Sequence, residues 1–235
     1  MTLVKHEHGG DPQTLESRFG RPKQGWLDLS TGINPQPYVP KKLHLESWGS
    51  LPNASGLSKL KHAAAMCYGV GDPDLITAAP GTQSLIQWLP RMRPLGRVSV
   101  ISPTYNEHAQ CWLNAEHIVK EAFDLTQAEE NSDVIIVVNP NNPDGYQHPP
   151  NDLKILAQRQ AEKGGWLIVD EAFCDVMPEL SIASSVGSPG LIVLRSFGKF
   201  YGLAGLRLGF ALSDPVIAER LYTFLGPWAV STPAI

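Results

Sequence analysis

The sequence contains few cysteines, no long apolar run and no signal-like N-terminus. Its three cysteines, Cys67, Cys111 and Cys174, are scattered over 235 residues, which is too sparse for a disulfide framework or a CxxC metal site. No apolar run reaches the ~20 residues that a membrane-spanning helix requires, and residues 1–11 are polar, unlike a secretory signal peptide. These absences lead us to expect a protein of the reducing cytoplasm.

Charge of either sign is also modest. With 19 Lys+Arg against 23 Asp+Glu, the formal net charge is −4, so no basic surface for nucleic acid or for an anionic membrane is indicated. His6 and His8 could bind a metal, but without further ligands nearby in the sequence a polar arm is the better interpretation. We therefore expect no nucleic-acid, membrane or metal partner.

Behind an N-terminal arm, the sequence alternates strand-like and helix-like segments. Residues 1–56 are rich in Gly, Pro and Asn, so we assign residues 1–50 to an arm and residues 51–235 to one large domain. A helical pattern starts at Leu57 and ends before Gly69. The expected strands are Val98–Ile101, Val134–Val138, Trp166–Val169 and Leu191–Leu194, and the expected helices are Gln83–Arg91, Asn106–Ala115, Asp152–Lys163 and Pro215–Leu225.

Continuous apolar strands separated by helices predict an α/β fold, with a mostly parallel sheet covered by helices on both faces. The segment Leu206–Leu212 is the exception. The residues between it and Leu191–Leu194 are glycine-rich and leave no room for the crossover helix that a parallel partner needs. We predict that Leu206–Leu212 forms one antiparallel strand in this sheet.

Glycine, aromatic and amide residues lie near the ends of the expected strands, where folds of this type bind ligands. Gly81 and Thr82 open a helix whose N-terminus could hold a phosphate, and Tyr105 could stack on a flat ring. Asn142 lies in a turn that two prolines bracket. Each feature alone also has an ordinary interpretation, as a helix start, a core tyrosine or a turn.

A second group of polar residues follows the last two parallel strands. Asp170 ends one strand, where it could cap a helix or face a protonated ring nitrogen. Ser196 and Lys199 follow the next strand, with Arg207 further along. A lysine in an apolar, glycine-rich stretch can lose solvation and become nucleophilic, although a lone lysine is ordinarily solvated. Together the two groups match one ligand, a phosphorylated aromatic aldehyde with a ring nitrogen and a phenolic oxygen.

Three segments carry a resemblance to a known family. Asn139–Gly145, Asp170–Phe173 and Ser196–Gly209 resemble motifs of the fold-type-I enzymes of the class I and II aminotransferase family, which depend on pyridoxal 5'-phosphate (PLP). The resemblance runs from about Leu51 to the C-terminus. It implies the large domain of such an enzyme, with a mostly parallel sheet, one antiparallel strand and helices on both faces.

The resemblance also implies a role for each candidate residue. Lys199 would hold PLP as an internal Schiff base and later move protons, and Asp170 would keep the pyridine nitrogen protonated so that the ring accepts electrons. Asn142 would bind the phenolic oxygen, and Tyr105 would stack on the ring as part of the catalytic set. The implied phosphate ligands are Gly81, Thr82, Ser196 and Arg207.

Further segments point to one branch of the family. His8–Asp11, Leu27–Pro35 and Gly226–Ser231 are similar to segments of threonine-phosphate decarboxylases and related cobalamin-biosynthesis proteins. Phe173 stands where aminotransferases usually have a tyrosine. The branch implies decarboxylation of L-threonine O-3-phosphate to (R)-1-amino-2-propanol O-2-phosphate, with His8 and Asn34 as candidate contacts to this small phosphorylated substrate.

Two alternatives to the decarboxylase stay open. An aminotransferase, for instance one that acts on histidinol phosphate, would use the same cofactor residues, and a non-catalytic PLP-fold module would use none of them in chemistry. Relatives continue into a C-terminal small domain that supplies substrate-binding arginines, so we expect this chain to lack that domain. Sites in this family are usually built across two subunits, which leads us to expect a homodimer.

Overall fold

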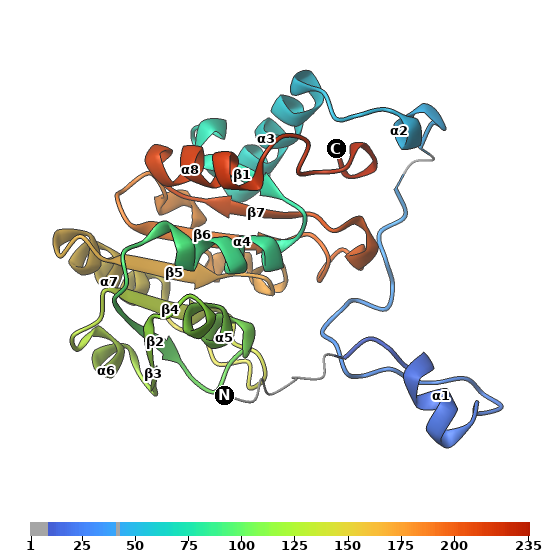
Figure 1. Cartoon of the computed structure of the whole chain (residues 1–235), viewed down its shortest axis with the longest axis horizontal. Helices are drawn as coiled ribbons and strands as arrows, with labels where there is room; N and C mark the ends of the chain where they lie inside the picture. Colours follow the sequence, from blue (N-terminus) through green and yellow to red (C-terminus); the bar gives the residue numbers. More distant parts are fainter. Residues whose placement is uncertain (1–8, 41–42) are drawn as a thin grey trace.

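The computed structural model describes residues 9–40 and 43–235, and in this part of the chain a mixed sheet of seven strands forms the centre of the fold (Figure 1). The strands are β1 (Ile76–Ala79), β2 (Arg97–Ile101), β3 (Ile118–Ala122), β4 (Val134–Val138), β5 (Trp166–Asp170), β6 (Leu191–Ser196) and β7 (Gly209–Leu212). Their spatial order is β1-β7-β6-β5-β4-β2-β3. Only β7 runs antiparallel to its neighbours, β1 and β6. The predicted fold class is therefore confirmed.

Helices pack on both faces of the sheet (Figure 1). The α-helices are α1 (Gln13–Phe19), α2 (Glu46–Gly49), α3 (Ala54–Tyr68), α4 (Thr82–Trp88), α5 (Glu107–Asn114), α6 (Leu125–Glu129), α7 (Pro150–Glu162) and α8 (Pro215–Leu225). Buried side chains of α3, α6 and α7 belong to one apolar cluster, and those of α4, α5 and α8 to another. These two clusters are the two layers of core that enclose the sheet.

Local signals in the sequence set the ends of several helices. Asn53 caps α3 by accepting a hydrogen bond from the backbone of Gly56 (2.7 Å), and Gly69 ends this helix with a φ of 68°, a conformation that favours glycine. Asp214 caps α8 by accepting from the backbone of Ile217 (3.0 Å). The helix α8 spans the range predicted from the sequence.

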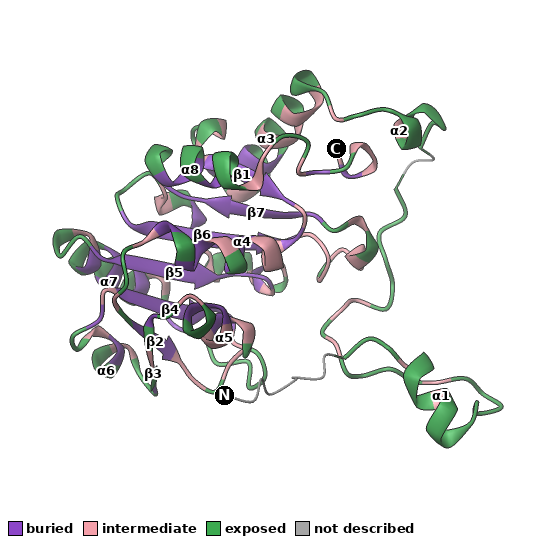
Figure 2. Cartoon of the chain, viewed as in Figure 1, coloured by how far each residue is buried: buried purple, intermediate pink, exposed green. Residues whose placement is uncertain are grey.

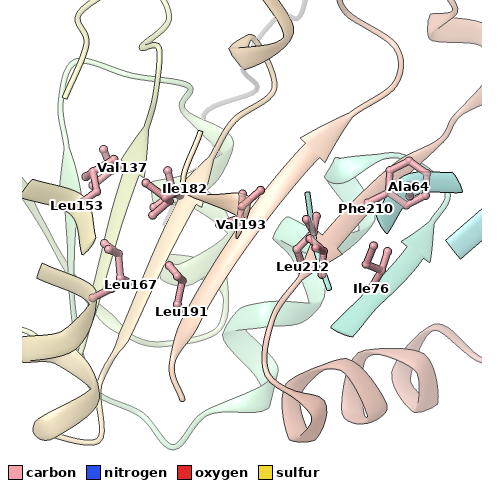
Figure 3. Close-up of a cluster of buried hydrophobic side chains, with 14 of the residues drawn as sticks. Ala64, Ile76, Val137, Leu153, Leu167, Ile182, Leu191, Val193, Phe210 and Leu212 are labelled. Atoms are coloured by element: carbon pink, nitrogen blue, oxygen red, sulfur yellow. The ribbon is translucent and has the colours of Figure 1, made fainter. Parts of the chain in front are cut away.

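Side chains of the central strands alternate between the two core layers. In β4, Val137 packs in the layer of α3 and α7, whereas its neighbour Ile136 packs in the layer of α4 and α5. Figure 3 shows part of the first layer, in which Leu212 lies between Val193 and Ile76, its partners in β6 and β1. Because every residue of β4 and β5 is buried, these strands read as continuous apolar runs.

Two differences from the expected strands have physical reasons. The antiparallel strand starts only at Gly209, because Ala204–Leu206 form a 3-10 turn and Arg207 adopts a left-handed φ of 51°. Strands β1 and β3 were not predicted. Strand β3 lies at the edge of the sheet and exposes Lys120 and Glu121, so its sequence lacks an apolar run.

The described part of the N-terminal arm contributes no buried residue to the core, and its α1 projects away from the domain (Figure 1). Between residues 9 and 50, no described residue is buried (Figure 2). Two main-chain hydrogen bonds tie the arm to the loop after β6: Asn34 N donates to Lys199 O (3.0 Å) and Tyr38 N donates to Tyr201 O (2.8 Å). Within the described residues, no helix has the length and apolar character needed to cross a bilayer.

The central position of Leu212 generates a stability prediction. Leu212 is fully buried between β1 and β6, so Leu212→Ala removes apolar contacts and leaves a cavity. We expect it to lower the free energy of unfolding by about 2–5 kcal/mol, measured by urea denaturation. The control Val216→Ala, at an exposed position of α8, should change it by less than about 0.5 kcal/mol. Equal effects of the two substitutions would contradict this account of the core.

Candidate active site

A cavity of about 220 Å³ opens beside the carboxyl ends of β4, β5 and β6. In doubly wound folds ligands bind at this end of the sheet. The structure brings all eight of the predicted cofactor-binding residues to this cavity. They are Gly81, Thr82, Tyr105, Asn142, Asp170, Ser196, Lys199 and Arg207.

Asp170 is the buried carboxylate of the cavity. It ends β5 and is 4% exposed. Its Oδ1 accepts a hydrogen bond from the backbone of Ala172 (3.0 Å), and its Oδ2 lies 2.8 Å from Nε2 of the buried His108. A carboxylate only accepts hydrogen bonds, so the imidazole donates to it. This contact orients Asp170 and stabilises its negative charge.

His108 was not predicted from the sequence. It lies in the first turn of α5, and its backbone N donates to the carbonyl of Tyr105 (3.2 Å). The two rings pack edge to face. A signal was present, since a histidine three residues after the candidate Tyr105 lies one helical turn away. The partner of the imidazole, Asp170, is 62 positions away in the sequence, and only the fold brings the two together.

Lys199 lies in the loop after β6 and is partly buried. Its Nζ lies 5.5 Å from the centroid of the Phe173 ring. Burial lowers the pKa of this amine and the positive charge of Arg207 lowers it further, while the carboxylate of Asp170 acts in the opposite direction. A larger share of Lys199 is therefore neutral, and nucleophilic, than of an ordinary surface lysine.

Arg207 and Gly81 form a cationic corner of the cavity. Gly81 has a φ of 82°, and a Cβ at this position would lie 2.6 Å from Nη2 of Arg207. Only glycine allows the guanidinium to approach this turn so closely. Thr82 and the buried Ser196 place hydroxyl groups along the same cavity, so the corner combines one positive charge with donors suited to an anion.

The turn after β4 separates the roles of two neighbouring asparagines. The side chain of Asn141 is bound within the protein: its Nδ2 donates to Pro103 O (2.9 Å) and to Asp144 Oδ1 (2.7 Å), and its Oδ1 accepts from Thr104 (2.7 Å). Asn142 lines the cavity. Asn141 therefore holds the turn, and Asn142 is the residue that can meet a ligand.

The predicted substrate contacts in the arm have different outcomes. His8 lies outside the described residues. Asn34 donates from Nδ2 to Phe200 O (2.9 Å) and accepts at Oδ1 from Gln36 N (2.9 Å), while its neighbour Ile33 lines the cavity. The arm therefore reaches the cavity at Ile33, and the substrate role of Asn34 stays a prediction.

A buried ion pair joins the strand ends behind the cavity. Arg195 donates from Nη1 to Glu171 Oε2 (2.9 Å) and from Nη2 to Asp175 Oδ1 (2.6 Å), and its guanidinium lies 4.5 Å from the centroid of the Tyr68 ring. Burial raises the pKa of Glu171, although the hydrogen bonds to this carboxylate, Arg195 included, oppose the shift. Sequence reasoning missed the pair, whose members are adjacent to Asp170 and Ser196.

Comparison with known proteins places the chain in the class I and II aminotransferase family. The family model "Aminotransferase class I and II" matches residues 25–235. The chain is 45% identical to a threonine-phosphate decarboxylase of Pseudomonas aeruginosa, over 97% of this chain and 68% of that protein. It is 44% identical to a threonine-phosphate decarboxylase of Sinorhizobium sp., over 97% of this chain and 69% of that protein. The chain thus spans about two thirds of the length of these relatives.

The fold also matches solved structures. The crystal structure of L-threonine-O-3-phosphate decarboxylase from Porphyromonas gingivalis superposes with a TM-score of 0.72 at 22% identity, over 81% of this chain and 63% of that one. At this identity the likeness shows a shared fold. It agrees with the mixed sheet described above.

The charges around Lys199 generate a prediction with opposite signs for two substitutions. Asp170→Asn removes the charge that raises the pKa of Lys199, so this pKa should fall, whereas Arg207→Met removes a charge that lowers it, so the pKa should rise. The measurement is the pH dependence of Lys199 modification by an amine reagent, followed by peptide mass spectrometry. Lys163, remote on the other side of the sheet at the end of α7, should keep one profile throughout. Shifts of the same sign in both variants would contradict this electrostatic account.

Proposed function

The chain belongs to the class I and II aminotransferase family, and we propose that it is a PLP-dependent carboxy-lyase that converts L-threonine O-3-phosphate into (R)-1-amino-2-propanol O-2-phosphate. The observation that carries this proposal is its similarity, over nearly the whole chain, to two threonine-phosphate decarboxylases. The residues around the cavity at the strand ends support the assignment of PLP as the cofactor. A product of this kind would supply the aminopropanol linker of cobalamin.

The residues present fit PLP in their chemistry. Lys199 offers a desolvated amine for the aldehyde, and Asp170 offers a buried carboxylate for the pyridine nitrogen. The corner formed by Arg207 and Gly81, where a Cβ has no room, suits a phosphate, with Thr82 and Ser196 as further ligands. Asn142 and Tyr105 line the same cavity, and we assign Asn142 to the phenolic oxygen and Tyr105 to stacking on the ring.

In the proposed reaction the protein residues bind, orient and move protons. When bound, PLP supplies a ring that accepts the electron pair left at the α-carbon as CO₂ departs. Asp170, held by His108, keeps a proton at the pyridine nitrogen. Lys199 returns a proton to the α-carbon of the substrate. We assign His8 and Asn34 to contacts with the phosphate or carboxylate of the substrate.

We extend the proposal to domain organisation, assembly and location. Residues 1–50 act as an arm and residues 51–235 as the cofactor domain. Large apolar side chains along the arm are exposed, with Leu27 at 81%, Leu29 at 80% and Val39 at 83%, and a second copy of the chain would cover them in a homodimer. The enzyme works in the cytoplasm, where its free cysteines stay reduced.

Two measurements on the same protein test the proposed function. PLP should bind with a visible or near-UV absorption band that Lys199→Ala abolishes, and the loaded protein should release CO₂ and aminopropanol phosphate from threonine O-3-phosphate. We expect Lys199→Ala to lower turnover by more than ~10³-fold.

The other outcomes identify the alternatives. Conversion of the cofactor to pyridoxamine phosphate with a keto product, and a requirement for an amino acceptor such as 2-oxoglutarate, would indicate an aminotransferase. No absorption band, and no effect of Lys199→Ala, would indicate a non-catalytic module and overturn the proposal.

A further inference from the structure

At the wall of the cavity, three side chains are joined by hydrogen bonds, and the proposed reaction uses only the ring of one of them, Tyr105. The hydroxyl of Tyr105 donates to Gln83 Oε1 (3.1 Å), and Gln83 Nε2 donates to Glu107 Oε2 (2.6 Å). Tyr105 and Gln83 both line the cavity. Gln83 belongs to α4 and Glu107 to α5, and these helices pack against each other on one face of the sheet (Figure 1).

Glu107 sets the direction of both hydrogen bonds. An ionised carboxylate accepts hydrogen bonds and donates none, and the thiol of Cys111 also donates to Oε2 of Glu107 (3.9 Å). The amide of Gln83 must therefore turn its nitrogen to Glu107 and its oxygen to Tyr105. An amide oxygen only accepts, so the proton of the phenol has to point at Gln83.

We propose that Gln83 is a positioning residue that fixes the ring of Tyr105 and takes the hydrogen bond of its phenol, so that Tyr105 offers a ligand only its ring face and an accepting oxygen. With the ligand taken as PLP, this inference rests on the proposed function. Tyr105 then acts by stacking and delivers no proton, which leaves proton transfer at the α-carbon to Lys199. Burial and the charge of Glu107 raise the pKa of Tyr105 to about 12, which keeps the phenol protonated.

Substitutions at Gln83 and Glu107 test the direction of these hydrogen bonds. Gln83→Leu removes both hydrogen bonds and should weaken PLP binding by about three- to tenfold at every pH. Gln83→Glu places two carboxylates side by side, which pair well only while they share a proton. Its PLP affinity relative to the parent should therefore fall as the pH rises from 6 to 9.

The double variant Gln83→Glu/Glu107→Gln restores both hydrogen bonds, and Tyr105 still donates to the side chain at position 83. The carboxylate introduced at position 83 accepts from Tyr105 and from the new amide. The PLP affinity of the double variant should return to within about twofold of that of the parent protein, without the pH dependence expected for Gln83→Glu. Gln87→Leu, at an exposed position one turn further along α4, is the matched control and should bind PLP like the parent.

A ligand-free readout separates this inference from the proposed function. In the NMR spectrum of the apoprotein, the side-chain amide protons of Gln83 are assigned by their loss in Gln83→Leu. Glu107→Gln should move them strongly, because their acceptor loses its charge, and Tyr105→Phe should move them little.

The two proposals fail in different ways. A parent protein that binds no PLP, with these amide shifts as expected, would refute the proposed function and support the role of Gln83. The positioning role would be overturned if the Gln83 amide protons keep their chemical shifts in Glu107→Gln. It would also be overturned if the double variant binds PLP no more tightly than Gln83→Glu, or if Gln83→Leu binds PLP as tightly as the parent protein.

Discussion

The site depends on one buried interaction, the ion pair between Glu171 and Arg195. Both side chains are nearly inaccessible to solvent, at 0% for Glu171 and 4% for Arg195, and they join the carboxyl ends of the neighbouring strands β5 and β6. Asp175 adds a second carboxylate to Arg195. Removal of one partner from a buried pair typically costs about 3–5 kcal/mol, because the other charge is left without compensation. The pair therefore holds the two strand ends in one arrangement.

The alternation of side chains along a strand connects the ion pair to the cavity. Successive side chains point to opposite faces, so the ion pair lies on one side of the sheet while Asp170 and Ser196, each adjacent to one of its members, face the cavity on the other. The loop after β6 carries Lys199 and is bound to the arm. The ion pair on one face of the sheet thus fixes the distance between Asp170 and Ser196 on the other face. His108 and the chain of hydrogen bonds from Tyr105 to Glu107 give the opposite wall of the cavity the same rigidity.

Much of the fold, and the group of polar residues that surrounds the cavity, was predictable because each follows from a local pattern. Continuous apolar runs gave the central strands, and a strand-end location selected Asp170 and Asn142 among many polar residues. The misses have two causes. His108 and Gln83 matter because of partners that are distant in sequence, and the exposed edge strand β3 lacks the apolar pattern that reveals a buried strand. In the arm, Asn34 was chosen by motif, and the structure shows its amide bound to the backbone of Phe200 and Gln36.

The sequence by itself determined the four central parallel strands and the main helices around them, the reversed strand after a short glycine-rich connection and the residues that lie at the strand ends. These features follow from hydrophobic periodicity, segment length and turn-forming residues, all of which depend on residues that are close in the sequence. The tertiary structure alone decided that the amide of Asn141 is bound within its turn, that His108 holds Asp170, and that Glu171 and Arg195 neutralise each other in the core. Hydrogen-bond partners and desolvation depend on groups that meet only when the chain has folded, and no local pattern in the sequence records them.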